Sequence, residues 1–413
     1  MEQVDILFFS GLFPKNEETE IKEKMKSGMA DAQSALQWNI IDGLEANKCG
    51  ILTVLNRLPV NSYPRGYMDP FVKEFPFQHK CGELSDTNVG YCNITVIKQI
   101  TMGTPFRSKI RKWVKDGETL KKVFLLYGAF GLSLELAKAV KRWNDQVETV
   151  CIIADLPEYS SIVKQSGLRK LFENYEVRKS RKLCCYIDKF VLLTDQMAQR
   201  LQLAAPYVVM EGIAPRSETY TDSISIPELK DRSYILYTGT LHYEFGIGTL
   251  LDAFGRIQNP DIRLVICGFG EAEKAILESQ DKRIVYLGKV DRKQALALQQ
   301  RATVLVNPRQ NTEEFTKYSF PSKTMEYLAS GVPVVAYKLD GIPDEYDPYL
   351  NYVPDNSVEA LAETIQKIIN MSAEDRKEIG RRGQKFVLEE KSAQKQTKRI
   401  LDLINGIEMK TYR

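Results

Sequence analysis

The segment Phe315–Ala336, FTKYSFPSKTMEYLASGVPVVA, concentrates residue types that suit the binding of an anion. Pro321 precedes and Gly331 follows a helical pattern, which predicts a short helix over Ser322–Ser330. Lys323 would then lie in the first turn, where the positive end of the helix makes a cation unfavourable. The free N–H groups of a first turn bind anions, and a bound anion would make Lys323 favourable there. The alternative is a solvated lysine whose stem covers apolar surface.

Other polar residues follow apolar runs that are predicted to be strands. Arg309 lies just beyond the carboxyl end of one such run, and Asp155 comes directly after another. Ligands of open α/β sheets bind beyond the carboxyl ends of the strands, so both residues are candidates for binding or catalysis. A turn or cap is the alternative role for Asp155. Glu326 lies four residues after Ser322 and shares its face of the predicted helix.

These residues depend on a scaffold of short β-rich runs that alternate with helical patterns. The runs are apolar on both faces, as in parallel strands that are covered by helices on two sides. The alternation predicts doubly wound α/β structure, and its two series predict two Rossmann-like domains with a cleft between them. The first series is 6–10, 51–56, 123–127, 149–154, 190–194 and 207–210, and the second is 234–237, 263–267, 284–287, 303–306 and 332–336.

A polar stretch without periodicity separates the two series and predicts a linker over residues 215–232. The predicted domains are residues 1–214 and 233–395, and residues 396–413 form a closing amphipathic helix. About twenty residues separate the first strand from the next helix, a length that is typical of functional or disordered connections. Gly28 in this connection would let a ligand approach the backbone, and a simple turn is its alternative role.

Composition narrows the class of protein. With 43% hydrophobic and 27% charged residues, the chain has the composition of a globular protein. It has no run of ~18 apolar residues and its acidic N-terminus does not resemble a secretory signal, so we expect neither a membrane span nor export. Seven dispersed cysteines favour a reducing cytosol over a disulfide scaffold or a zinc site. A net charge of +3 does not indicate nucleic-acid binding.

The second half of the chain resembles glycosyltransferase family 4, a retaining family with the GT-B fold. The resemblance covers about residues 232–390, while the first domain matches mainly in architecture. It implies two Rossmann-like domains that face a central cleft, with the acceptor on the first and a nucleotide-sugar donor on the second. The pattern FPSKxxEYxxxG is similar to the branch of bacterial surface-polysaccharide transferases. The matching blocks are YILYTGTLHYEFGIGTLLDAF, LVICGFGE, RIVYLGKV, ATVLVNPR and FPSKTMEYLASGVPVVA.

The resemblance also implies roles for individual residues. Glu326 matches the glutamate that binds the ribose hydroxyls of the donor, and Gly239 matches the loop that faces the donor diphosphate. Lys289 falls where the family often contacts the base. The implied donor-binding residues are Glu326, Ser322, Phe320, Tyr318, Ser319, Gly239, Thr240, Lys289, Val290 and Gly28.

Several positions depart from the family pattern. The first glutamate of the family motif is Tyr318 here, and the basic pair that neutralises the diphosphate is replaced by Thr240 and Phe245. A diphosphate leaving group needs positive charge while the bond to the sugar breaks. Lys323 and Arg309 are therefore the predicted replacements, and together with Asp155 they are the predicted catalytic residues. We expect no metal and no cofactor, because the chain has no Asp-x-Asp pair and basic groups supply the charge.

Two segments, 107–122 and 164–182, each carry seven basic residues against two acidic ones. Helices of this kind lie on anionic lipid, and Trp113 in the first segment is a candidate aromatic anchor. The alternative is a pair of solvated faces. The resemblance favours the membrane, because many related enzymes extend lipid-linked sugars. We therefore expect a cytoplasmic protein, peripheral at the inner face of the membrane, with no nucleic-acid partner.

The resulting hypothesis is a retaining glycosyltransferase that moves a sugar from a nucleoside-diphosphate sugar to a hydroxyl. The expected acceptor is a saccharide or a lipid-linked saccharide in surface polysaccharide biosynthesis. One alternative is a nucleotide-sugar epimerase with the GT-B fold, which the presence of only two histidines disfavours. The other is a catalytically degenerate GT-B subunit that binds a partner, which the departures from the family pattern leave open. A nucleotide-binding measurement distinguishes that subunit from an enzyme.

Overall fold

The computed structural model describes residues 2–26, 31–80, 86–117, 119–156, 168–215, 226, 229, 232–312 and 314–411, with the side chains of 168–174 excepted. Contacts between Cα atoms divide the chain into two units. Unit 1 comprises Met1–Ile213 and Ala393–Arg413, and unit 2 comprises Ala214–Ser392. The predicted linker, 215–232, lies almost wholly outside the described residues. Each unit is an α/β structure and is described by itself.

Unit 1 is built on an eight-stranded sheet with the strand order β10-β9-β8-β7-β1-β2-β5-β4. The strands pair in parallel, except for the antiparallel pair of β4 and β5. The strands are β1 (Val4–Ser10), β2 (Gly50–Asn56), β4 (Phe75–Phe77), β5 (Asp86–Asn88), β7 (Lys121–Tyr127), β8 (Glu148–Ile153), β9 (Lys189–Leu192) and β10 (Tyr207–Val209).

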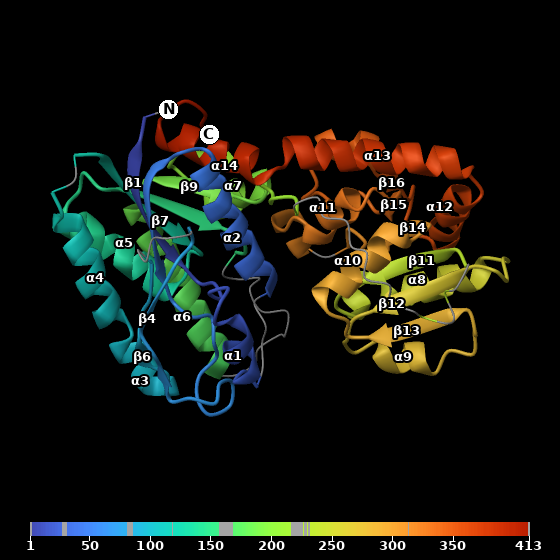
Figure 1. Cartoon of the computed structure of the whole chain (residues 1–413), viewed down its shortest axis with the longest axis horizontal. Coiled ribbons are helices and arrows are strands. Elements are labelled where there is room, and N and C mark those ends of the chain that lie inside the picture. Colours follow the sequence, from blue (N-terminus) through green and yellow to red (C-terminus); the bar gives the residue numbers. More distant parts are fainter. Residues whose placement is uncertain are drawn as a thin grey trace. The chain divides into compact units, whose positions relative to one another are not determined.

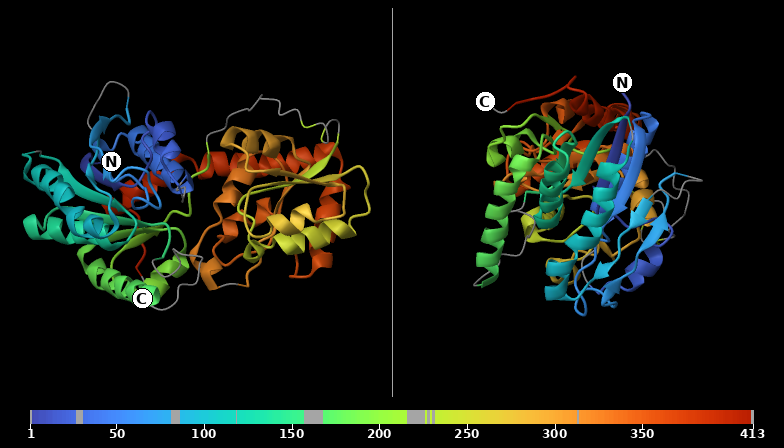
Figure 2. Two further views of the ribbon diagram at one scale, coloured as in Figure 1. Left: turned by 90° about the horizontal axis from the view of Figure 1, so that it is seen from below. Right: turned by 90° about the vertical axis from the view of Figure 1, so that its left-hand side faces the viewer.

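Helices cover both faces of this sheet (Figures 1 and 2). On one face, α2 (Asp31–Ala46) and α14 (Ala393–Ile404) pack over alternate residues of β1 such as Ile6 and Phe8. On the other face, Phe9 of β1 meets Phe106 of α4 edge to face, with ring centroids 5.4 Å apart. The remaining elements are α1 (Glu18–Glu23), α3 (Thr95–Thr101), α4 (Gly103–Lys115), α5 (Gly131–Trp143), α6 (Leu168–Leu183), α7 (Asp195–Leu201) and the antiparallel pair β3 (Phe71–Val72) and β6 (Tyr91–Cys92).

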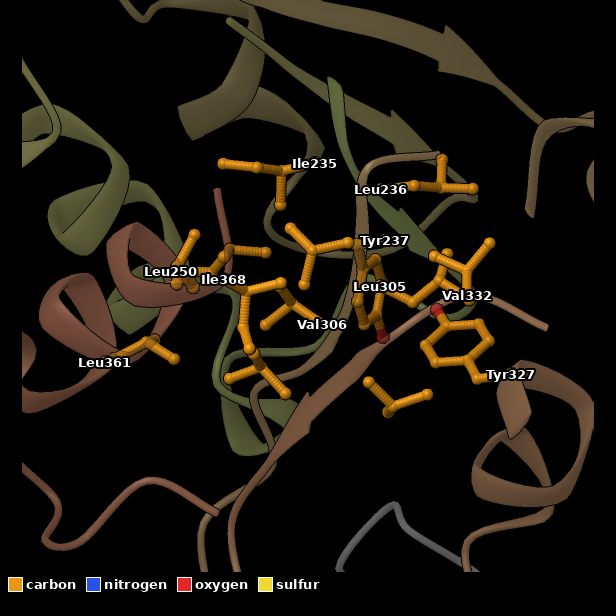
Figure 3. Packing of buried hydrophobic residues seen from close by; sticks show 14 of the residues in the cluster. Ile235, Leu236, Tyr237, Leu250, Leu305, Val306, Tyr327, Val332, Leu361 and Ile368 are labelled. Atoms are coloured by element: carbon orange, nitrogen blue, oxygen red, sulfur yellow. The ribbon is translucent and has the colours of Figure 1, made fainter. Parts of the chain in front are cut away.

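Unit 2 is built on a six-stranded parallel sheet with the order β13-β12-β11-β14-β15-β16. Figure 3 shows its core, with Leu250, Leu361 and Ile368 of α8 and α12 on one side of the strands and Tyr327 of α11 on the other. Its elements are β11 (Tyr234–Thr238), α8 (Ile247–Arg256), β12 (Arg263–Cys267), α9 (Glu273–Leu277), β13 (Ile284–Gly288), α10 (Arg292–Arg301), β14 (Val304–Asn307), α11 (Ser322–Ala329), β15 (Val334–Ala336), β16 (Asn351–Tyr352), α12 (Val358–Ile369) and α13 (Ala373–Glu390).

The predicted scaffold is confirmed strand by strand, because each of the eleven β-rich runs forms a strand of one of the two sheets. The predicted helix before Gly331 is α11, and Gly331 follows its C-cap with a left-handed φ of +78°. The region between β2 and α4 was not foreseen, since it contributes the β3–β6 pair and α3. Within the described part of the chain, no helix has both the length and the apolar character needed to cross a membrane.

Candidate functional site

A tight glycine turn forms the floor of the candidate site at the carboxyl end of β11. Gly239 has a φ of +147°, which L-residues rarely adopt, and its N–H donates to the carbonyl of Cys267 at 2.8 Å. The neighbouring Gly268, after β12, has a φ of +142°. A Cβ on Gly268 would lie only 1.7 Å from the carbonyl oxygen of Gly239. The two turns are therefore packed backbone against backbone.

Lys323 reaches into the Gly239 turn from the first turn of α11. A Cβ built on Gly239 would lie 2.0 Å from Cε and 2.1 Å from Nζ of Lys323. The N-cap residue, Pro321, has no side-chain hydrogen bond that caps the helix. Among the described residues, Lys323 has neither a hydrogen bond nor an ion pair within 4.0 Å. Burial and the charge of Arg309 lower the pKa of Lys323, although Glu326 acts in the opposite direction.

Arg309 brings a second cation to this edge of the sheet, two residues after β14. Its Nη2 donates to Oγ of Ser319 at 3.1 Å. The guanidinium carbon lies 4.5 Å from the ring centroid of Phe315 and 5.6 Å from that of Phe245. Its Nε is buried without a hydrogen-bond partner, and burial lowers the pKa of Arg309 to about 10. No ion pair joins Arg309 to a carboxylate in the described part of the chain.

The arrangement suits a multiply charged anion. Two cations lie near each other beside an uncapped helix N-terminus, and one of them has a buried donor that is left unsatisfied. Buried cations are normally paired, because removing a charge from water is costly. Two cations and the N–H groups of a first helical turn are what a phosphate binds, although the N–H of Thr324 already donates to the carbonyl of Pro321 at 2.8 Å. Phe245 stands where the resemblance implies a basic residue, and its ring supports Arg309 instead.

The carboxylate of Glu326 is held firmly beside this anion site. Its Oε1 accepts a hydrogen bond of 2.7 Å from Nε2 of Gln299, and its Oε2 lies 3.3 Å from Nη1 of Arg292. Gln299 is fully buried and also donates to Oγ1 of Thr238, at 3.1 Å. Glu326 thus has one oxygen fixed by a buried amide and the other paired with a largely exposed arginine, which a ligand hydroxyl could displace.

Most of the other donor-binding candidates lie near this site. Ser319 accepts from Arg309, and the carbonyl of Thr240 accepts from the hydroxyl of Tyr237 at 2.8 Å. Ser322 is exposed at the start of α11, and Tyr318 is partly buried in the preceding 3-10 turn.

For three other donor-binding candidates, the structure shows contacts with neighbouring side chains of unit 2. Phe320 is 6% exposed, and its ring packs against Tyr346 in the core at a centroid distance of 5.3 Å. Val290 is partly buried against the same core. Lys289 is exposed, with its Nζ 5.9 Å from the ring centroid of Phe269. Phe320 therefore belongs to the core of unit 2, and Lys289 lies on its surface.

The candidates of unit 1 are Asp155 and Gly28. Asp155 lies beyond the carboxyl end of β8, and Nε2 of Gln33 on α2 donates to its Oδ2 at 3.3 Å. Burial raises the pKa of Asp155, and the hydrogen bond from Gln33 opposes this shift. The buried hydroxyl of Tyr127, at the end of β7, has no hydrogen-bond partner among the described residues. Gly28 lies outside the described residues.

The first basic segment lies mainly in α4, where its tryptophan is partly buried. Nε1 of Trp113 donates to Oδ1 of Asp5 at 3.0 Å, and the ring packs against Phe124 with a centroid distance of 6.5 Å. Trp113 thus makes contacts within unit 1, and its role as a membrane anchor stays a prediction. The second segment lies partly outside the described residues. No group of three or more His, Cys, Asp or Glu side chains that could hold a metal occurs among the residues described.

Two partners of Glu326, Gln299 and Arg292, were missed from the sequence. Gln299 lies among the buried residues of α10, which include Leu296 and Leu298. A glutamine on the core-facing side of a helix was the available signal, because buried amides need partners.

Comparison with known proteins covers unit 2 by a family model and the whole chain by solved structures. Residues 221–405 match the family model of the glycosyl transferases group 1. None of the curated proteins matches the chain. Solved structures match it over its whole length, at identities that indicate a shared fold alone.

Three of these structures are enzymes of sugar metabolism or their complexes. Sucrose-phosphate synthase from Thermosynechococcus elongatus has 15% identity and a TM-score of 0.63, covering 98% of this chain and 99% of that one. A trehalose-6-phosphate structure from E. coli, bound with UDP-2-fluoro glucose, has 10% identity, a TM-score of 0.64 and coverages of 98% and 100%. A lipopolysaccharide outer core galactosyltransferase has 13% identity, a TM-score of 0.60 and coverages of 98% and 99%.

The chain has the GT-B fold. The family match adds that the part containing Gly239, Arg309, Lys323 and Glu326 is similar in sequence to glycosyltransferases. The four residues therefore lie in the portion of this GT-B protein that both kinds of comparison cover.

Proposed function

We propose that this GT-B protein is a glycosyltransferase whose unit 2 binds the diphosphate of a nucleotide-sugar donor. The observation that carries the proposal is the position of Lys323, whose ammonium lies against the Gly239 turn without a carboxylate partner among the described residues. Arg309 supplies a second cation, and Glu326 offers a carboxylate for the ribose hydroxyls. The family match over residues 221–405 supports this assignment.

The proposed chemistry needs charge stabilisation more than proton transfer by the protein. The bond between the sugar carbon and the phosphate oxygen breaks, and negative charge collects on the diphosphate, where Lys323 and Arg309 stabilise it. The acceptor oxygen bonds to the same carbon, and its proton passes to the leaving phosphate oxygen. Attack from the face that the phosphate leaves retains the configuration. Asp155 is proposed to contact the transferred sugar or the acceptor.

The acceptor is proposed to be a hydroxyl of a saccharide or a lipid-linked saccharide in surface polysaccharide biosynthesis. This part rests on the similarity of FPSKxxEYxxxG to that branch of transferases. No metal or cofactor takes part in the proposed reaction, since the two cations act on the diphosphate directly.

A thermal-shift screen with UDP, GDP, ADP and CDP tests the proposal. At 100 times its Kd, the correct nucleotide should stabilise the protein by about 2.7 kcal/mol. The matching nucleotide sugars should then be tested for release of free nucleoside diphosphate in the presence of saccharide acceptors. If no nucleoside diphosphate shifts the unfolding temperature, the donor-site assignment is wrong and a degenerate partner-binding subunit becomes the better explanation.

A further inference from the structure

Helix α3 of unit 1 presents its aliphatic side chains to solvent. Ile100 is 76% exposed, Val96 67% and Ile97 44%, and none of the seven residues of the helix is buried. A helix on the surface of a globular protein normally turns such residues toward the core. The exposed face of α3 is therefore apolar where a solvated face would be polar.

A lysine on the inner side fixes this orientation. Nζ of Lys98 donates to the carbonyl of Val60 at 3.0 Å and to Oδ1 of Asn93 at 2.9 Å. It also lies 5.4 Å from the ring centroid of Tyr91. Burial and the charge of Arg57 lower the pKa of Lys98 to about 8, which shows how far the amine is withdrawn from water. These bonds thus hold Lys98 inward, whereas Thr95, Gln99 and Thr101 are exposed together with the three aliphatic side chains.

The adjoining segment adds two more exposed apolar residues. Phe71 of β3 is 60% exposed and Met68 is 50% exposed. Phe71 pairs with Cys92 of β6, and the N–H of Asn93 donates to the carbonyl of Pro70 at 2.7 Å. Figure 1 shows β6 beside α3, at the start of α4. We call these five residues the apolar tip: Met68, Phe71, Val96, Ile97 and Ile100.

The charge around the apolar tip is positive. Arg65, Lys73, Arg107 and Arg111 are exposed on the neighbouring segments. The described acidic residues of the same region are partly neutralised. Lys24 pairs with both Asp69 at 3.2 Å and Glu20 at 2.8 Å, and Glu74 pairs with Lys109 at 2.8 Å. Asp86 is buried and contacts His79. These pairs leave one carboxylate charge uncompensated, against the four exposed arginine and lysine side chains.

We propose that the apolar tip docks the protein on an anionic lipid bilayer. Its aliphatic and aromatic side chains enter the boundary between headgroups and acyl chains, while the surrounding arginines and lysine contact lipid phosphates. An apolar face rimmed by cations has the chemistry of an interfacial membrane site. This inference is independent of the donor-site proposal, because it concerns residues of unit 1 that take no part in binding the nucleotide.

Sedimentation with vesicles of phosphatidylcholine, with and without an equal part of phosphatidylglycerol, tests the proposal. The protein should bind the anionic vesicles at low salt and bind the neutral ones much more weakly. Combined Val96→Ser, Ile97→Ser and Ile100→Ser changes should reduce the partition coefficient at least tenfold. Combined Arg107→Gln and Arg111→Gln changes should reduce it several-fold and flatten its dependence on salt.

Leu277→Ser is the matched control, because Leu277 is 66% exposed in unit 2 and far from the tip in sequence. It should leave vesicle binding unchanged. The unfolding temperature of the α3 variant without ligand should stay close to that of the wild type, which shows that the variant is folded. Equal binding of the wild type and the α3 variant would overturn the proposal. It would also be overturned if the wild type ignores anionic vesicles but self-associates through the tip, since the tip would then be a protein interface.

Discussion

The groups that surround Lys323 determine the pKa of its ammonium group. Folding places its ammonium against Gly239, near Arg309 and without a carboxylate partner in the described residues, so its charge is disfavoured and its pKa is lowered. Between that lowered pKa and the ordinary value near 10.5, the unfolded chain binds more protons than the folded one. Stability should therefore rise with pH in this window. A bound diphosphate would offset the cost of the charge and remove this dependence.

Replacing Lys323 with alanine should separate binding from stability. Transfer should fall on the order of 100-fold, because a cation that stabilises developing charge is lost. The empty protein should be as stable as the wild type or up to about 1 kcal/mol more stable, because a cation at a helix N-terminus is removed. Steady-state kinetics and thermal unfolding with and without nucleoside diphosphate measure both effects.

Lys274→Ala is the control for this experiment, since Lys274 is 83% exposed and pairs only loosely with Glu278 at 3.7 Å. It should change neither transfer nor the ligand-induced shift. If Lys323→Ala instead melts clearly earlier and keeps the full shift with ligand, Lys323 is a structural residue.

Gly239→Ala should disturb the same lysine without removing its charge. The new Cβ would occupy the position of Cε and Nζ of Lys323, and the flexible side chain would have to move away. Alanine would also be strained at a φ of +147°, at a cost of about 1–3 kcal/mol. We expect a weaker thermal shift with nucleoside diphosphate and lower transfer. Gly406→Ala imposes a left-handed φ of +71°, and its Cβ would meet only Cε of Met409 at 3.8 Å, so it should cost stability while leaving transfer intact.

At the scale of elements, the strands were predictable and the details of the site were less so. Each β-rich run became a strand because buried parallel strands are apolar on both faces, a pattern that is local in sequence. The pairing of Gln299 with Glu326 depends instead on how α10 packs beside α11, which no local pattern reveals. The outward apolar face of α3 was missed for a related reason, since its orientation depends on the bonds of Lys98 to Val60 and Asn93.

The connection between β4 and β5 in unit 1 should make stability depend on pH. Nδ1 of His79 lies 2.7 Å from Oδ2 of Asp86, and its Nε2 lies 3.4 Å from Oε1 of Glu45. Burial disfavours the charged imidazole, but the two carboxylates outweigh it and raise the pKa of His79. The stabilisation should be complete below the unfolded value near 6.5 and should be lost as the pH rises through the raised value.

Urea unfolding at a series of pH values from about 5.5 to 8.5 measures this effect. His79→Gln keeps a polar side chain of similar size but does not titrate. It should lower stability most at the acidic end of the range and flatten the profile. An unchanged slope in this variant would show that the pH dependence comes from other groups.

At the scale of the whole molecule, unit 1 is completed by a helix that follows unit 2 in sequence. Ile400, Leu401, Leu403 and Ile404 of α14 are buried in the core beneath the sheet of unit 1. The contact with α2 is close, because a Cβ on Gly43 would lie 2.3 Å from the carbonyl oxygen of Ala393 and 2.5 Å from Oγ1 of Thr397. The side chain of Asn47 adds a hydrogen bond of 2.7 Å to the carbonyl of Gln394.

Gly43→Ala should therefore destabilise the protein even though alanine favours a helix. The added methyl group would force α14 away from α2, and overpacking of this kind costs about 1–3 kcal/mol. Gly255→Ala in α8 meets nothing within 4 Å and should instead stabilise by about 0.5–1 kcal/mol. Chemical denaturation measures the free energy of unfolding of both variants, which should fall for Gly43→Ala and rise for Gly255→Ala. If Gly43→Ala stabilises the protein as Gly255→Ala does, then α14 does not pack closely on α2 in solution.

The place of α14 in the chain also has a consequence for folding during synthesis. A ribosome adds about 5–20 residues per second, and domains usually fold in the order in which they emerge. Here the first 213 residues emerge early but cannot close the core of unit 1 until Ala393–Ile404 have followed. Unit 2, whose residues 214–392 are continuous, can fold while unit 1 waits. The part of the molecule that is translated first is thus the last to be completed. Until then the apolar face of α2 is exposed, and chaperones can bind it.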